Sequence, residues 1–79
     1  MVIFTVLLEG VEGSHGYFLN VEVACETPSQ AGSLARTAAE QNGAMIISIE
    51  EINKTSKEAA VTSPQVVFMS GRSYFQLGH

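Results

Sequence analysis

The sequence has few of the residues from which small catalytic and metal sites are built. Its 79 residues include no aspartate, no tryptophan, one cysteine and two histidines, and all eight acidic residues are glutamates. A single cysteine excludes an intrachain disulfide, which fits a reducing compartment such as the cytoplasm. Structural zinc sites use four Cys or His ligands at short spacings, and neither C-x-x-C nor H-x-x-x-H occurs here. We therefore expect no metal site.

The sequence also has few residues that could form a nucleophilic catalytic site. A Ser-His-acid triad would have to use His15 or His79. Ser14 precedes His15, but sequence neighbours rarely present their side chains in triad geometry. Glu50 and Glu51 would lie on opposite faces of a strand, so they would not form a carboxylate pair. We expect a non-enzymatic protein with no catalytic residues and no cofactor.

Positive charge is scarce. The only lysines and arginines are Arg36, Lys54, Lys57 and Arg72, and the formal net charge is −4. A nucleic-acid-binding surface needs a basic patch to neutralise phosphates, so direct DNA or RNA binding is not expected. A basic protein, or a protein that itself binds nucleic acid, would suit this charge as a partner. With only 15% charged residues, the surface also favours association, and a homodimer is an alternative.

Long hydrophobic runs are absent as well. The apolar start, MVIFTVLLEG, is too short to span a membrane and has no basic segment before it. We expect a cytoplasmic protein that does not bind membranes. Residues 1–79 form one expected domain, near the lower end of sizes that fold unaided.

Two strands are expected in the first third of the chain. Residues 2–9 are rich in β-branched and aromatic residues, and both faces are mostly apolar, which predicts a central strand. The glycine-rich residues 10–16 predict a hairpin-type connection. Residues 17–26 alternate, with one face expected in the core and the other in water. The expected core positions are Leu19, Val21, Val23 and Cys25, so the lone thiol should be buried and inert.

A helix is expected over the stretch TPSQAGSLARTAAEQNG. Thr27 suits the N-cap, Pro28 the first helical position and Gln30 the partner in a capping box. Asn42-Gly43 predicts the C-terminal stop. The apolar stripe is mostly alanine, which lets a helix lie close to a sheet. Its members are Ala31, Leu34, Ala35 and Ala38.

The last part of the chain predicts a strand, a loop and a further strand with two possible courses. Residues 44–52 predict a strand with Met45, Ile47 and Ile49 on one face. Residues 54–64 are polar and predict a loop, and residues 65–77 predict a fourth strand. That strand either continues through Ser70-Gly71-Arg72 or turns there into a terminal hairpin.

The expected fold class is α+β. One helix packs on one face of a four- or five-stranded, mainly antiparallel sheet in the order strand, strand, helix, strand, strand. Whether the crossover through the helix joins parallel or antiparallel strands is left open. The second face of the sheet has no helix to cover it, and a partly apolar open face is a candidate interface.

The segment SGRSYF, residues 70–75, places an arginine beside two aromatic residues. Arginine and tyrosine are enriched at interface hot spots, so Arg72 and Tyr74 are candidate contacts, together with the carboxylates Glu22 and Glu50. The alternative is structural: Phe75 in the core, Tyr74 half-exposed and Arg72 a solvated turn residue.

The stretches VEVACETPSQAGSLARTAAEQNG, IISIEEI and GRSYF give the chain the layout of a class of small acidic proteins. This layout resembles that of bacterial and phage inhibitors of the toxin-immunity and anti-CRISPR type. The resemblance implies a protein that acts by occupying the surface of another protein, and it assigns no functional residue. The main function hypothesis is therefore a protein-binding module. The alternatives are a homo-oligomeric structural protein or small subunit, and a small-molecule-binding domain with its site at a dimer interface.

Overall fold

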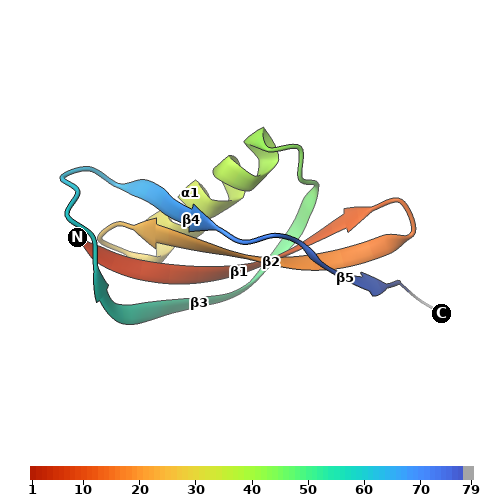
Figure 1. The fold of residues 1–79 in the computed structure, drawn as a ribbon, viewed down its shortest axis with the longest axis horizontal. Coiled ribbons are helices and arrows are strands. Elements are labelled where there is room, and N and C mark those ends of the chain that lie inside the picture. The colour runs from red at the N-terminus through yellow and green to blue at the C-terminus, as the bar shows by residue number, and fades with distance from the viewer. Residues whose placement is uncertain (78–79) are drawn as a thin grey trace.

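The computed structural model describes residues 1–77, which form one helix on one face of a five-stranded antiparallel sheet (Figure 1). The elements are β1 (Val2–Glu12), β2 (His15–Ala24), α1 (Pro28–Gln41), β3 (Ile46–Glu58), β4 (Gln65–Met69) and β5 (Ser73–Gln76). The expected fold class and the expected order of elements are confirmed.

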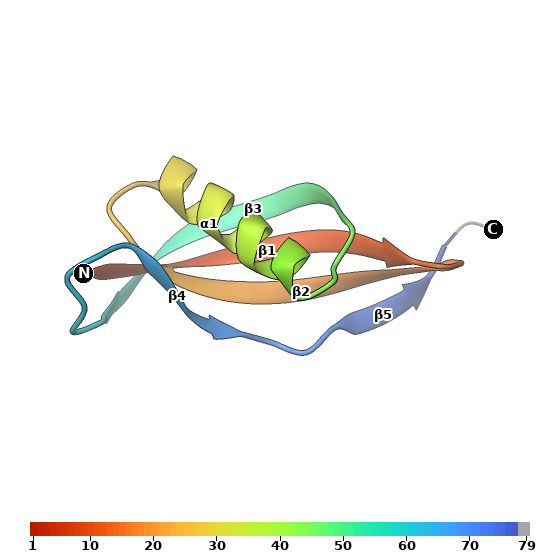
Figure 2. The same ribbon diagram turned by 90° about the horizontal axis from the view of Figure 1, so that it is seen from above.

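The sheet has the strand order β3-β1-β2-β4, with β5 also pairing with β2. The strand β1 is central, as its two apolar faces predict. Since β2 and β3 are both antiparallel to β1, they run parallel to each other on either side of it. The connection through α1 therefore crosses over β1, and Figure 2 shows the helix lying along this part of the sheet. This answers the question that the sequence left open about the crossover.

The β1–β2 hairpin closes more tightly than its glycine-rich sequence suggests. The strands pair as far as Glu12 and His15, so only Gly13 and Ser14 form the turn. Gly13 has a φ of 60°, while no non-glycine residue among those described has a positive φ. Glycine at the first central position is the pattern of a type II′ turn, whose twist matches that of the flanking strands.

The helix begins and ends where its capping residues predict. The Thr27 side chain accepts a hydrogen bond from the backbone N–H of Gln30 at 3.2 Å. The Gln30 side chain accepts in return from the N–H of Glu26 at 3.0 Å, one residue before the position that a capping box would use. Gly43, with a φ of 85°, ends the helix. The stripe is turned slightly from the expected one, since the fully buried helix positions are Ala31, Gly32, Ala35 and Ala39.

The strand β3 differs most from the expectation. It begins at Ile46 and runs to Glu58, so the first part of the predicted loop over residues 54–64, up to Glu58, is strand. Its pairing with β1 shifts register between Leu7 and Leu8 and again between Glu9 and Gly10. These irregularities break the two-residue period. The expected alternation was therefore wrong, because Ile46 and Ile49 both pair with helix-side positions of β1. Ile46 is buried, whereas the three residues expected to share one face are exposed: Met45 (66%), Ile47 (52%) and Ile49 (38%).

The C-terminal segment is one strand path interrupted in the middle. Both β4 and β5 pair antiparallel with β2, so the alternative of a terminal hairpin was wrong. Residues 70–72 leave the sheet between them but stay attached to it. Ser70 donates its N–H to the Asn20 carbonyl at 2.8 Å, and the Asn20 N–H donates to the Ser70 hydroxyl at 2.9 Å.

The helix is too short to cover the sheet. Its 14 residues span about 21 Å, whereas the 11 residues of β1 span about 36 Å. The molecule is accordingly elongated, with extents of 43 × 22 × 19 Å. The core lies under α1, and the hairpin end extends beyond the helix (Figure 1). Side chains from β5 cover that end, because β5 pairs with β2 at its hairpin end.

Candidate protein interface

The side of the sheet opposite α1 has no helix over it among the described residues (Figure 1). The core beneath the helix takes alternate positions of β1 and β2, so the intervening positions point to the other side. We call this surface the open face. It includes Ile3, Thr5, Leu7, Glu9, Val11, Phe18, Asn20, Glu22, Glu51, Phe68 and Phe75, placed by cross-strand pairing.

The hairpin end of the open face is apolar. The rings of Phe18 and Phe75 are stacked with centroids 4.9 Å apart. Phe75 lies over Gly16, where a Cβ atom would stand 2.5 Å from the ring. Val11 pairs with Gly16 on the other side, and Leu77 beside them is 39% exposed. The two phenylalanines are only half-buried, so this end keeps apolar surface in water.

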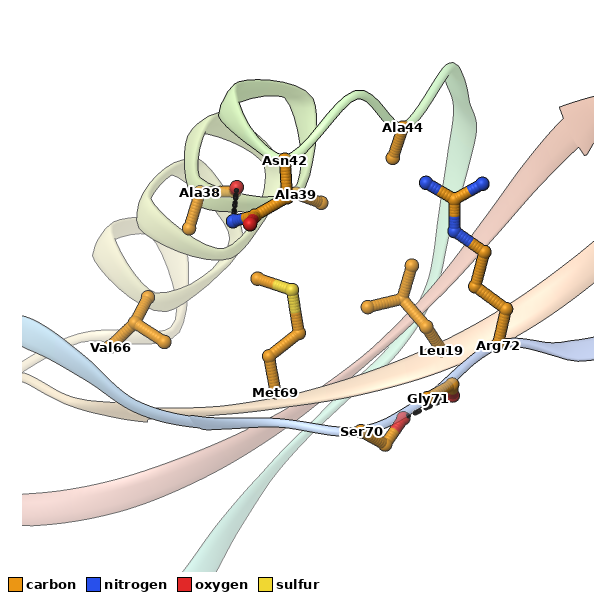
Figure 3. Close-up of a pocket in the computed structure, with 10 residues that line it drawn as sticks. All are labelled: Leu19, Ala38, Ala39, Asn42, Ala44, Val66, Met69, Ser70, Gly71 and Arg72. Carbon is orange, nitrogen blue, oxygen red and sulfur yellow. Dashed lines mark hydrogen bonds between the residues drawn. The ribbon is translucent and has the colours of Figure 1, made fainter.

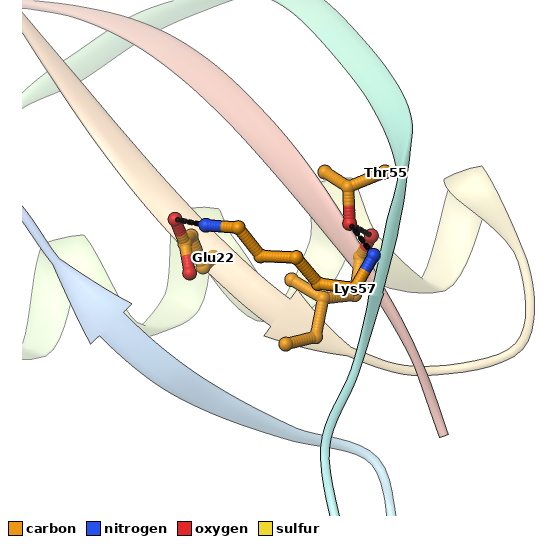
Figure 4. Close-up of polar contacts among 4 residues, drawn as sticks. Glu22, Thr55 and Lys57 are labelled. Atoms are coloured by element: carbon orange, nitrogen blue, oxygen red, sulfur yellow. Dashed lines mark hydrogen bonds and ion pairs between the residues drawn. The ribbon is translucent and has the colours of Figure 1, made fainter.

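At the other end of the open face, polar side chains of the chain itself lie over part of the sheet (Figure 4), while Phe68, paired with Glu22, stays 53% exposed. Lys57 reaches from β3 across β1 to Glu22 on β2, with 3.4 Å between Nζ and Oε2. Thr55 donates its hydroxyl to the Ile3 carbonyl at 2.7 Å. Ile3 is only 7% exposed although no helix covers it. The stem of Lys57 crosses this part of β1 on its way to Glu22, and long charged side chains can cover apolar surface while their charge stays in water.

The charge of the open face is negative. Glu9, Glu22 and Glu51 lie on it, and Lys57 is the only one of the chain's four lysines and arginines placed there. Two of the other cations are paired elsewhere, Arg36 with Glu40 on α1 and Arg72 with Glu12 at the hairpin end. The open face therefore combines an apolar aromatic end with a carboxylate-rich middle.

Arg72 and Tyr74 lie on the opposite side of the sheet, at the hairpin end beyond α1. The Arg72 guanidinium stacks 4.6 Å above the ring of Tyr17, which is fully buried. Its Nη1 donates to Oε1 of Glu12 at 2.8 Å, and the Tyr74 hydroxyl donates to the same oxygen at 2.8 Å. We call these four residues the tyrosine cluster. The bonds from Tyr74 and Arg72 hold the pKa of Glu12 below its ordinary value of 4.5.

The four residues proposed from the sequence as interface contacts therefore do not form one site. Arg72 and Tyr74 meet in the tyrosine cluster, Glu22 lies on the open face, and Glu50 lies at an irregular point of β3, where it accepts a hydrogen bond from Ser48. Arg72 is not a solvated turn residue, because its side chain is only 28% exposed and packs on Tyr17.

Tyr74 and Phe75 do lie on opposite faces, as their adjacency in a strand predicts, but neither belongs to the core. Sequence reasoning missed the Phe18–Phe75 pair. Its signal is weak, because it depends on β5 pairing with β2 and on Gly16 leaving room for a ring.

The residues considered for chemistry are scattered. His15 is exposed at the start of β2, and His79 lies outside the described residues. Within residues 1–77, no group of three or more His, Cys, Asp or Glu side chains is arranged to hold a metal ion. Cys25 is buried as expected, and burial raises the pKa of its thiol. No helix in the same range has the length and apolarity needed to cross a membrane.

Comparison of the chain with protein-family models, with curated proteins and with solved structures finds no match.

Proposed function

We propose that this protein is a non-enzymatic protein-binding module that docks its open face on a basic surface of a partner protein and inhibits the partner by covering that surface. The observation that carries the proposal is the composition of the open face. A stacked, half-exposed aromatic pair is flanked there by carboxylates, with one lysine that is already paired.

The chemistry of this face favours a foreign partner over a second copy. Two open faces brought together would set the carboxylates of one copy against those of the other, and like charges across an interface cost free energy. A surface rich in lysine or arginine would instead neutralise Glu9 and Glu51. The aromatic pair would supply the desolvated centre that interfaces need. Complementary charge would also speed the encounter, most strongly at low salt.

A charge-matched pair of double variants tests the proposal. Glu9→Lys/Glu51→Lys reverses the charge of the open face, and Glu26→Lys/Glu40→Lys makes the same change of net charge on other exposed positions. Each variant and the wild type would carry an affinity tag in cells that produce the protein. Captured proteins would be identified by mass spectrometry, and the affinity of the purified partner measured by calorimetry.

We expect the wild type and the Glu26/Glu40 variant to capture the same basic protein in a one-to-one complex. We expect the Glu9/Glu51 variant to bind this basic protein with an affinity that is lower by roughly tenfold or more, because several charge contacts are disrupted. Raising salt from about 50 to 500 mM should weaken the wild-type complex, because screening shortens the range of the attraction. Equal binding by both double variants would refute the open face as the interface. A partner whose activity is unchanged in the saturated complex would refute inhibition.

A further inference from the structure

A groove runs on the helix side of the sheet, between the C-terminal half of α1 and the segment from β4 to residue 72 (Figure 3). Its volume is about 490 Å³. We call it the helix-edge groove. It is lined by Leu19, Ala38, Ala39, Asn42, Ala44, Val66, Met69, Ser70, Gly71 and Arg72.

The groove exists because the helix presents small side chains to this edge of the sheet. Ala38, Ala39 and Ala44 form one wall, and Val66 and Met69 stand opposite (Figure 3). Alanine lets a helix approach the sheet, but it does not fill the space between the helix and an edge strand. The result is a partly apolar groove whose size lies within the range of small-ligand sites.

Two polar side chains of the groove already donate hydrogen bonds to the backbone, whereas Arg72 has donors to spare. The Asn42 side-chain amide donates to the Ala38 carbonyl at 2.9 Å, and the Ser70 hydroxyl donates to the Gly71 carbonyl at 2.8 Å. Arg72 stands at one end, beside Ala44 (Figure 3). The guanidinium of an arginine has five N–H donors arranged along its edges. In Arg72, the hydrogen bond from Nη1 to Glu12 uses only one of these donors. The guanidinium can therefore serve a second acceptor.

We propose that the helix-edge groove binds an amphipathic aliphatic carboxylate, with its chain between α1 and Met69 and its carboxylate on Arg72. A partly apolar groove that ends at a guanidinium matches a ligand with an alkyl chain and a planar anionic head, because arginine pairs with carboxylates in a fork-like geometry. This site lies on the opposite side of the sheet from the open face, so it does not depend on the proposed protein-binding function.

Glu12 competes with such a ligand. Its carboxylate occupies one edge of the same guanidinium and adds a like charge near the ligand head. Glu12→Gln keeps an oxygen that can accept from Arg72 and Tyr74 but removes the charge. The proposal therefore requires Glu12→Gln to bind the ligand more tightly than the wild type does, by several-fold.

The test uses octanoate as the probe, with 1-octanol and octylamine as matched head groups. Titration would be followed by heteronuclear NMR of the labelled protein. With octanoate we expect saturable chemical-shift changes confined to the groove residues and to the Arg72 side-chain Nε resonance. We expect 1-octanol and octylamine to bind more weakly or not at all. Arg72→Gln should lower octanoate affinity roughly tenfold or more, as expected when a hydrogen bond to a charged group is lost.

Two helix variants locate the site independently of Arg72. Ala38→Leu places a leucine inside the groove and should abolish octanoate binding, whereas Thr37→Leu places the same side chain at the adjacent exposed position and should not. If Arg72→Gln fails to fold, the Nε shift in the wild type and the gain in Glu12→Gln still decide the head-group contact. Absence of saturable octanoate binding, equal binding of 1-octanol, or indifference to Ala38→Leu would each overturn the proposal.

Discussion

Gly10 faces Tyr17 across the hairpin, and replacing it by alanine tests how firmly the hairpin end is packed. A Cβ atom at position 10 would lie 2.5 Å from Cζ of Tyr17 and 2.6 Å from its hydroxyl oxygen. The Gly10 backbone is not in the left-handed region, so alanine suits the backbone and the conflict is with the ring alone. That ring is fully buried and carries the Arg72 guanidinium on its surface. It therefore cannot turn away without breaking the tyrosine cluster.

The size of the effect follows from two opposing contributions. Forcing an extra carbon into a packed site costs about 1–3 kcal/mol. Alanine also restricts the unfolded chain relative to glycine, which returns about 0.4–1 kcal/mol. We expect Gly10→Ala to lower the free energy of unfolding by about 1–2 kcal/mol. For a domain of this size, each kcal/mol shifts the melting temperature by about 4–8 °C, so the expected loss is about 5–15 °C.

The assay is thermal and urea unfolding followed by circular dichroism, with two glycine controls. Gly71→Ala meets nothing within 4 Å, so its stability should stay within about 0.5 kcal/mol of the wild type. Gly16→Ala would meet Phe75 at 2.5 Å, but that ring is half-exposed on a four-residue strand and can move. The loss in free energy of unfolding for Gly16→Ala should therefore lie between the losses for Gly71→Ala and Gly10→Ala. A Gly10→Ala protein as stable as Gly71→Ala would refute the packing described for Tyr17.

Two further predictions concern the same cluster. The Tyr17 hydroxyl is buried without a hydrogen-bond partner among residues 1–77, so Tyr17→Phe should leave the melting temperature unchanged or raise it. A loss of more than about 1 kcal/mol would show that the hydroxyl is bonded. The folded pKa of Glu12 lies below 4.5, so its charge stabilises the fold above that pH, and this contribution disappears as pH falls through the folded pKa. The melting temperature of wild type minus that of Glu12→Gln should be positive near pH 7 and should decrease as the pH falls below 4.5 and through the folded pKa. A difference independent of pH would refute the ionic contribution.

The helix and the first two strands could be predicted because local chemistry decides them. Thr27, Pro28 and Gly43 have capping preferences that do not depend on the rest of the chain. The alternation of the second strand is likewise visible in its sequence, although Ala24, expected in water, is fully buried. In these segments the local preferences and the tertiary packing point to the same structure.

The strand β3 could not be predicted in the same way. Its polar C-terminal half, residues 53–58, has little intrinsic preference for strand, and pairing with β1 decides its conformation. The irregularities that expose Ile47 also depend on register, and nothing local to the sequence marks them. The route of β5 is non-local too, since it rejoins β2 about sixty residues away along the chain. The Phe18–Phe75 pair, which the candidate interface depends on, was missed for that reason.

A partner protein would have to displace fewer existing contacts at the open face than at the tyrosine cluster. Because α1 is shorter than the hairpin, β5 supplies one aromatic residue to each side of its end, Tyr74 to Tyr17 and Phe75 to Phe18. On the helix side, Glu12 already holds one edge of the Arg72 guanidinium, so a partner protein that needed that edge would have to break an existing charged hydrogen bond. On the open side nothing among residues 1–77 completes the cover of Phe18 and Phe75. Burying their exposed area contributes about 25 cal/mol per Å² with no such loss. Arg72, which the sequence suggested as an interface contact, therefore stabilises the hairpin end of the fold. Phe75, which follows Tyr74 in β5, is the better anchor for a partner protein.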